Sequence, residues 1–213
     1  MAAKAIFITA TGTDAGKTFV VSSLIAYYSA LGLKVAPFKP IETGVLSQPQ
    51  DAAALQKIAF GFDHNPIFTL ETICPIRFAL AAAPAIAKGG APIDWEAIDL
   101  AFKRLSDESD LILIEGAGGA FAPIDESFFG IDLSARFKAK TLLISRDNLG
   151  MIHDLLTTIE AIEKRSGVLP LWAVNVRSAD DFEKISEPYL ARHFGRFNRL
   201  DKDFEIIADT LIR

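Results

Sequence analysis

The chain has 213 residues and a formal net charge of −5 at pH 7, with 22 Lys and Arg residues against 27 Asp and Glu residues. This length predicts one domain, residues 1–213. The acidic balance argues against a nucleic-acid partner. A composition of 50% hydrophobic and 23% charged residues excludes an intrinsically disordered chain. The single cysteine, Cys74, cannot form an intrachain disulfide and is typical of a reducing compartment.

The apolar segments are too short for a targeting or membrane role. The first apolar run, residues 5–10, is shorter than the hydrophobic region of a signal peptide. The longest mostly apolar stretch, residues 78–87, is interrupted by Pro84 and is far below the roughly 18 residues that span a bilayer. We therefore expect a cytoplasmic protein with no membrane partner.

Buried strands and amphipathic helices alternate along the chain. Apolar runs without polar alternation predict strands buried on both faces, at residues 5–9, 34–38, 111–114, 141–145 and 171–176. Helical periodicity follows at residues 20–31, 95–105 and 152–162, and Gly32 is suited to end the first helix. This alternation predicts an α/β fold, a doubly wound and mostly parallel sheet flanked by helices.

Two regions carry weaker patterns. The connection of residues 39–110 is too long for a simple crossover and is rich in proline, so we expect extra helices or functional segments there. Beyond Gly195 the pattern is weak, although apolar residues between 204 and 211 share one face of a possible last helix.

A glycine-containing loop, residues 11–18, joins the first strand to the first helix. Phosphate groups bind at such a helix N-terminus, where unpaired N–H groups and the positive end of the helix dipole meet. Gly16 lets the backbone approach a phosphate, Lys17 would reach the terminal phosphates, and Thr18 would complete a magnesium site. The strict Gly-x4-Gly-Lys-Thr pattern fails because Thr11 occupies its first position. An ordinary turn with a helix cap is the alternative.

Other candidate residues follow the predicted strands, at the sheet edge where ligands of doubly wound folds bind. Glu115 ends an apolar strand and precedes a glycine-rich segment, which suits a magnesium ligand. Lys39 follows the second strand, either as a cation for phosphoryl transfer or as a solvated lysine. On spacing alone, Asp51 is better interpreted as a helix N-cap. Asn175 is either a ligand-binding or a structural amide.

Four motifs in chain order resemble those of ATP-dependent dethiobiotin synthetases, which have a P-loop NTPase-like fold. They are residues 13–18, residues 39–44 (Lys-Pro-Ile-Glu-Thr-Gly), residues 115–119 (Glu-Gly-Ala-Gly-Gly) and residues 148–150. The resemblance implies that ATP and Mg²⁺ drive ring closure on 7,8-diaminononanoate with CO2. One amine would form a carbamate, the γ-phosphoryl group would transfer to it, and the second amine would displace phosphate.

The resemblance also implies roles for individual residues. Lys17 and Lys39 would be catalytic, and Thr18, Asp51 and Glu115 would hold magnesium, which replaces the N-cap interpretation of Asp51. ATP would be bound by Thr13, Asp14, Ala15, Gly16, Lys17, Thr18, Phe19, Asp51, Glu115, Gly116, Ala117, Gly118 and Asn175. The substrate would contact Thr43, and, across a homodimer interface, Gly150, Met151, Ile152, His153 and Tyr189.

This sequence departs from the family pattern at three places, the first of which is Asp14, where glutamate is commoner. His153 stands where asparagine is usual, and no Gly-x-(Ile/Leu)-Pro segment, which helps to enclose adenine in the family, follows Asn175. The alternative function is a ParA/MinD-like regulatory ATPase, but such proteins usually carry an extra lysine early in the loop, and residues 10–13 contain none. An amidotransferase-type synthetase would need a glutaminase domain, for which 213 residues leave no room.

Overall fold

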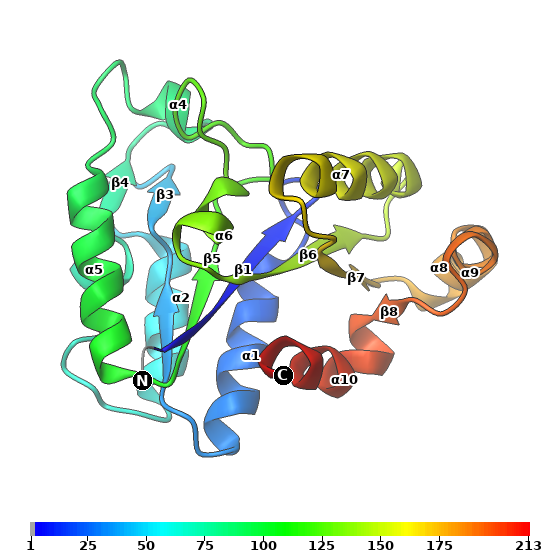
Figure 1. Ribbon diagram of the computed structural model, residues 1–213, viewed down its shortest axis with the longest axis horizontal. Helices are drawn as coiled ribbons and strands as arrows, with labels where there is room; N and C mark the ends of the chain where they lie inside the picture. The colour runs from blue at the N-terminus through cyan, green and yellow to red at the C-terminus, as the bar shows by residue number, and fades with distance from the viewer. Residues whose placement is uncertain (1–2) are drawn as a thin grey trace.

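The computed structural model describes residues 3–213, in which a six-stranded parallel sheet lies between helices (Figure 1). The strand order is β2-β5-β1-β6-β7-β8. The strands are β1 (Lys4–Ala10), β2 (Val35–Phe38), β5 (Leu111–Glu115), β6 (Lys140–Arg146), β7 (Leu171–Asn175) and β8 (Asn198–Arg199). The predicted doubly wound α/β fold is confirmed.

Burial on both faces explains why the five predicted strands are found. All residues of β2 and β5 are buried, and β1 is buried from Ile6 to Ala10. Such strands carry continuous apolar runs, which are legible in the sequence. The sixth strand, β8, was not predicted because it contains only Asn198 and Arg199, too few residues to form a pattern.

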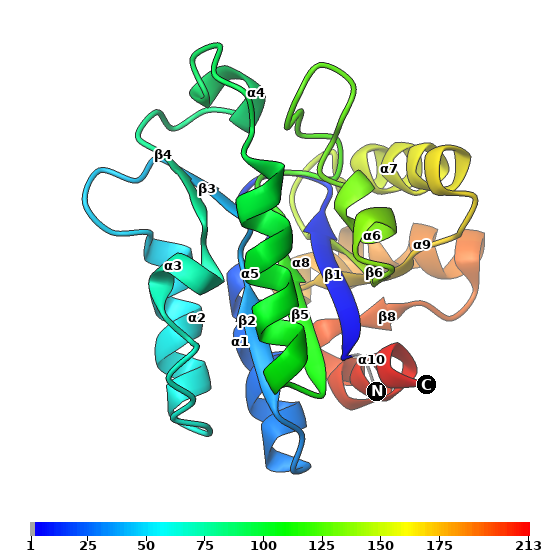
Figure 2. The ribbon, with the colours of Figure 1, turned by 60° about the vertical axis from the view of Figure 1, so that its left-hand side comes forward.

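Helices cover both faces of the sheet (Figure 2). Helices α1, α2 and α10 pack on one face, and α5, α6 and α7 pack on the other. The helices are α1 (Lys17–Ala30), α2 (Gln50–Phe60), α3 (Leu70–Ile73), α4 (Pro84–Ala87), α5 (Trp95–Glu108), α6 (Asp132–Arg136), α7 (Met151–Ser166), α8 (Ala179–Ile185), α9 (Glu187–Phe194) and α10 (Leu200–Ile212). Gly32 follows α1 with a φ of 87°, so its predicted role in ending that helix is confirmed.

The long connection between β2 and β5 folds into extra elements, as expected. It contains α2 to α5 and a separate two-stranded parallel sheet, formed by β3 (Ile41–Thr43) and β4 (Ile76–Phe78). Strand β3 follows directly from the end of β2, so it lies at the carboxyl edge of the main sheet. Cys74 is buried beside these elements as a free thiol, as predicted.

The C-terminal segment packs against the first helix. Ile207, Ala208 and Leu211 of α10 are buried, which confirms the predicted last helix. The buried hydroxyl of Tyr28 in α1 donates a hydrogen bond to the Ala208 carbonyl at 2.7 Å. Within residues 3–213, no helix combines the length and the apolar character that crossing a membrane requires.

The Tyr28 hydrogen bond generates a stability prediction. Tyr28→Phe leaves the Ala208 carbonyl buried without this donor, so we expect the free energy of unfolding to fall by about 1–3 kcal/mol. Tyr27→Phe is the matched control. The Tyr27 hydroxyl donates a hydrogen bond to the half-buried Asp209 side chain of α10, and water can replace this donor. Urea denaturation measures both; equal losses in the two variants would contradict the prediction.

Candidate active site

A cavity of about 670 Å³ lies at the carboxyl edge of the sheet. It brings together the loop before α1, the end of β5, strand β3 and the start of α2, which are distant in sequence. The residues that line it are Thr13, Asp14, Gly16, Lys17, Thr18, Phe19, Lys39, Glu42, Thr43, Asp51, Glu115, Ala117, Gly118, Arg146 and Arg177. Most of the predicted phosphate and metal residues therefore face one space, together with Thr43 of the predicted substrate residues.

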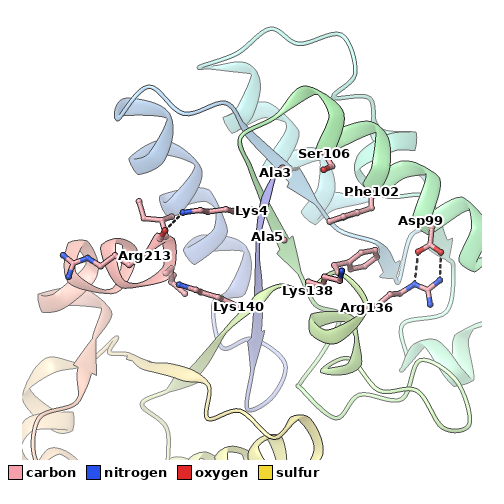
Figure 3. A pocket seen from close by; sticks show the side chains of 13 residues that line it. Ala3, Lys4, Ala5, Asp99, Phe102, Ser106, Arg136, Lys138, Lys140 and Arg213 are labelled. Carbon is pink, nitrogen blue, oxygen red and sulfur yellow. Dashed lines mark hydrogen bonds and ion pairs between the residues drawn. The ribbon is translucent and has the colours of Figure 1, made fainter. Parts of the chain in front are cut away.

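A second hollow, of about 660 Å³, lies at the opposite edge of the sheet (Figure 3). Five cations line it: Arg136, which pairs with Asp99, Lys4, which donates to the Ile212 carbonyl, and Lys138, Lys140 and Arg213. Ligands of doubly wound folds bind at the carboxyl ends of the strands. The cavity at the carboxyl edge is therefore the candidate active site.

The loop before α1 has the conformation of a phosphate cradle. Asp14 and Gly16 have φ values of 59° and 94°, and Gly16 is the N-cap of α1 and provides no side-chain cap. Backbone N–H groups at this helix start are thus available to an anion. The loop is fixed from β7, because the Asn175 amide donates to the Ala15 carbonyl at 2.9 Å. Arg177 donates to the Asp14 carbonyl at 2.6 Å.

Lys39 lies at the centre of a buried charge cluster. Its ammonium is 2.5 Å from Glu115 Oε1 and 3.0 Å from Asp51 Oδ2. The Thr18 hydroxyl donates to the same Glu115 oxygen at 2.9 Å. Lys39 and Glu115 are 3% and 1% exposed, so neither charge is compensated by water. The interpretation of Lys39 as a solvated lysine is wrong.

The cluster shifts the ionisation of its members. Burial alone would lower the pKa of Lys39, but the charges of Glu115 and Asp51 raise it above the usual lysine value. Burial likewise favours neutral Asp51, yet the charge and the hydrogen bond of Lys39 hold the pKa of Asp51 below its usual range. Lys17 has the opposite shift: burial and the nearby Lys39 charge lower its pKa. An anionic ligand beside Lys17 would therefore offset the repulsion between the Lys17 and Lys39 charges.

Asp51 does not cap its helix. The N-cap of α2 is Pro49, and Asp51 stands in the first turn with its side chain directed to Lys39. The N-cap interpretation from spacing is wrong. The capping acceptor is instead Glu42, whose two carboxylate oxygens accept from the N–H groups of Asp51 and Ala52 at 3.1 and 3.0 Å.

The sequence analysis missed three residues that line the cavity: Glu42, Arg146 and Arg177. Arg146 ends β6 and Arg177 follows β7, so the strand-end argument that selected Glu115 would also have selected them. Glu42 lies inside the predicted motif of residues 39–44, but its contact with α2 has no sequence signal.

Several predicted residues lie outside the cavity. Ala15 and Asn175 are joined by a hydrogen bond on the side of the phosphate loop that faces away from the cavity. Gly116 packs against Phe7, and a Cβ atom added at Gly116 would lie 3.0 Å from the Phe7 ring. Gly150 caps α7, with Met151, Ile152 and His153 in its first turn, as expected for a helix start. Tyr189 stacks on His193 in α9. None of these substrate candidates lines the cavity of its own chain.

The donor set fits a magnesium ion. Glu115 Oε2 is a buried carboxylate oxygen without a hydrogen-bond partner among the described residues, and Asp51 and the Thr18 hydroxyl lie beside the same cluster. Mg²⁺ is typically held by one or two carboxylates together with phosphate oxygens and water. No group of three His, Cys, Asp or Glu side chains forms a metal cage in residues 3–213. A metal held jointly with phosphates is therefore the arrangement that these residues suit.

The close approach of Gly16 to Asn175 generates a prediction. A Cβ atom at Gly16 would lie 2.3 Å from Asn175 Nδ2, and the φ of 94° disfavours any L side chain. We expect Gly16→Ala to lower the free energy of unfolding by roughly 1–3 kcal/mol. Gly12→Ala is the control, because nothing lies within 4 Å of its added Cβ, and it should change stability by no more than roughly 0.5 kcal/mol. Chemical denaturation tests both, and a neutral Gly16→Ala would contradict this geometry.

Comparisons with solved structures identify the fold. The plasmid partition protein of Borrelia burgdorferi aligns over 100% of this chain and 99% of its own, with a TM-score of 0.57 and 12% identity. The MinC:MinD cell division complex of Aquifex aeolicus aligns over 98% and 86%, with a TM-score of 0.54 and 13% identity. At such low identity these likenesses show that the chain shares the fold of these proteins and carry no information on activity.

Sequence comparisons identify the family. A family model described as an AAA domain matches residues 4–202. The ATP-dependent dethiobiotin synthetase BioD of Wolinella succinogenes is 34% identical over 98% of both chains. The enzyme of the same name from Sulfurovum sp. is 36% identical over 86% of this chain and 88% of its own. With its phosphate loop, buried Lys39 cluster and full-length similarity to these enzymes, the chain belongs to the ATP-dependent dethiobiotin synthetase family.

Proposed function

We propose that the protein uses ATP and Mg²⁺ to close a cyclic urea on 7,8-diaminononanoate with CO2, giving dethiobiotin. The observation that carries the proposal is the convergence of the phosphate loop with the cluster of Lys39, Asp51 and Glu115 in one cavity. We further propose that residues 1–213 act as one synthetase domain and that two copies assemble into a homodimer.

The chemistry requires three bond-forming steps. One substrate amine attacks CO2 and loses a proton, which leaves a carbamate. A carbamate oxygen attacks the γ-phosphorus of ATP, and ADP departs. The second amine then attacks the activated carbonyl carbon, and inorganic phosphate leaves as the ring closes. Two anions, carbamate and triphosphate, must therefore approach each other, so the site needs cations at their junction.

Lys17 and Lys39 supply these cations. Lys17 starts α1, where the loop N–H groups bind the phosphates. Lys17 is buried, and the charge of a bound phosphate would offset the repulsion between Lys17 and Lys39. Lys39 follows the end of β2 and lines the same cavity as Thr43, which we assign to the diamine or its carbamate. The two lysines thus reach the reacting phosphoryl group from different elements, the start of α1 and the end of β2.

Magnesium would be held by Thr18, Asp51 and Glu115. When bound, it would neutralise the phosphate charge and orient the terminal phosphates for transfer. The Lys39 ammonium pairs with both of these carboxylates. Lys39 would therefore lie beside the metal site, where its charge would stabilise the transferring phosphoryl group.

The nucleotide base has a candidate place beside α1. A hollow of about 300 Å³ lies between Phe19 of α1, the end of β7 and the start of α10. Asn175, Val176, Leu200, Asp201 and Phe204 line it, so its walls are mostly apolar and Asp201 is its charged group. The structured C-terminal segment, in place of the missing proline motif, would cover the base.

The dimer would complete the substrate site. Gly150 and the first turn of α7 (Met151, Ile152 and His153) present a helix N-terminus, which favours a carboxylate. These residues and Tyr189 do not line the cavity of their own chain. Leu149, next to Gly150, is 100% exposed, as expected for a residue that a second copy covers. We therefore assign the substrate carboxylate to these residues of the partner subunit.

The decisive experiment measures phosphate release and dethiobiotin formation together. We expect ATP hydrolysis to be stimulated by diaminononanoate and bicarbonate when both are present, with one dethiobiotin formed for each phosphate released. A regulatory ATPase would hydrolyse ATP at the same rate without them. That second result, combined with no dethiobiotin by mass spectrometry, would overturn the proposed function.

Removal of either lysine should slow turnover. Lys17→Ala and Lys39→Ala each remove a charge that acts as phosphoryl transfer proceeds, so we expect kcat to fall by at least about tenfold. Lys39→Ala also leaves Glu115 buried without its cation, which costs about 3–5 kcal/mol of stability. Steady-state kinetics at saturating substrate, with circular dichroism to confirm folding, test this. Wild-type kcat in folded Lys39→Ala would remove Lys39 from the mechanism.

Base selectivity should be weak. Phosphate contacts are the same for every nucleoside triphosphate, and each base hydrogen bond contributes only about 0.5–1.5 kcal/mol. We therefore expect CTP or GTP to support turnover within roughly a hundredfold of ATP. Measuring kcat/KM for the four triphosphates tests this expectation. A preference for ATP beyond about a thousandfold would mean that the hollow beside Phe19 reads adenine specifically.

A further inference from the structure

Glu42 is a buried carboxylate that spans two parts of the candidate active site. It lies in β3, next to Thr43, is 6% exposed and lines the cavity. Its two oxygens accept one hydrogen bond each from the N–H groups of Asp51 and Ala52 in the first turn of α2. This one side chain therefore joins the strand that carries the substrate residue to the helix that carries a proposed metal ligand.

A helix cap alone does not explain a carboxylate at this position. Pro49, the N-cap of α2, offers no side-chain acceptor, although Ser, Thr, Asp or Asn there would satisfy the helix locally. Glu42 performs the task from another strand, and burial raises its pKa, so keeping it charged here is unfavourable. Unlike a cap from a residue next to the helix, Glu42 fixes the position of α2 relative to β3.

The fixed atom is the backbone nitrogen of Asp51 itself. Holding this N–H sets the direction in which the Asp51 side chain leaves the helix. Glu42 holds Asp51 at its backbone N–H, whereas Lys39 contacts its carboxylate. If a divalent cation bound the Asp51 carboxylate, the Glu42 contact would still fix the backbone from which that side chain leaves the helix.

We propose that Glu42 is a positioning residue for magnesium: it holds Asp51 in the orientation that binds the metal jointly with the nucleotide. This inference rests on the proposed function, because the metal and its ligands belong to that proposal. Glu42 itself touches neither the metal nor the phosphates in this role. Groups that orient metal ligands typically change metal affinity by about 10–100-fold when they are removed.

The test measures how strongly Mg²⁺ improves binding of a non-hydrolysable ATP analogue. Calorimetric titrations with Mg²⁺ and with EDTA give two dissociation constants, whose ratio is the metal coupling. We expect Glu42→Ala to reduce this ratio by at least about tenfold, while binding in EDTA changes little because the phosphate loop is intact. The expected change is therefore confined to the metal-dependent part of nucleotide binding.

Two further variants separate positioning from charge and from capping. Glu42→Asp keeps the charge but is too short to reach both N–H groups, so the coupling should fall by at least about threefold by the same reasoning. Asp94→Ala removes a comparable cap, since Asp94 accepts from the Ala97 N–H at 2.9 Å at the start of α5, away from the cavity. It should lower stability without altering the coupling.

The coupling measured in these variants either supports or overturns the positioning role of Glu42. Wild-type coupling in Glu42→Ala, or full coupling in Glu42→Asp, would overturn the positioning role. If Glu42→Ala does not fold, Glu42→Asp alone decides. If the wild-type protein itself shows no coupling, the magnesium part of the proposed function fails and the role of Glu42 falls with it. Absence of coupling in the wild-type protein would therefore be distinguishable from the result that supports the positioning role, in which only the Glu42 variants lose coupling.

Discussion

The site depends on one buried cation. Lys39 lies between Glu115 and Asp51, so it joins the ends of β2 and β5 to the start of α2. Glu115 is 1% exposed, so without this cation its charge would be buried and unpaired, which is far costlier than a buried pair, whereas the Asp51 side chain is 44% exposed. The three groups that we assign to phosphoryl transfer and metal binding thus also join these elements of the fold. The same ion pairs of Lys39 with Asp51 and Glu115 therefore serve both the folded structure and the proposed chemistry.

The parallel sheet makes this balance possible. The strand order places β1 between β5 and β6, so the phosphate loop that follows β1 faces the ends of its neighbours. Asn175 from β7 supports the loop from below, in the space that Gly16 leaves open. Helix α2 enters from the long connection and is bound by Glu42. The cations and carboxylates of the site therefore come from separate elements. Asn175 fixes the phosphate loop, and Glu42 fixes α2.

The C-terminal segment has a comparable organiser. Arg199 is buried, and its guanidinium pairs with Glu183, Glu187 and Asp201. These contacts connect α8, α9 and the start of α10, and they hold Asp201 at the hollow beside Phe19. The region thus reaches a defined structure through ion pairs and through packing of α10 on α1, although it lacks the proline motif that is usual in the family.

By itself, the sequence determined five strands of the main sheet, the main helices and the phosphate loop, because burial on both faces, helical periodicity and a strand-loop-lysine order are local properties. It also selected Glu115 and Lys39, since the ends of parallel strands meet at one edge. Tertiary structure alone decided the contact of Glu42 with α2, the position of Asp51 in its helix and the pairing of Lys39. Those depend on which distant groups meet without water, and a hydrogen bond between β3 and α2 leaves no periodic trace in the chain.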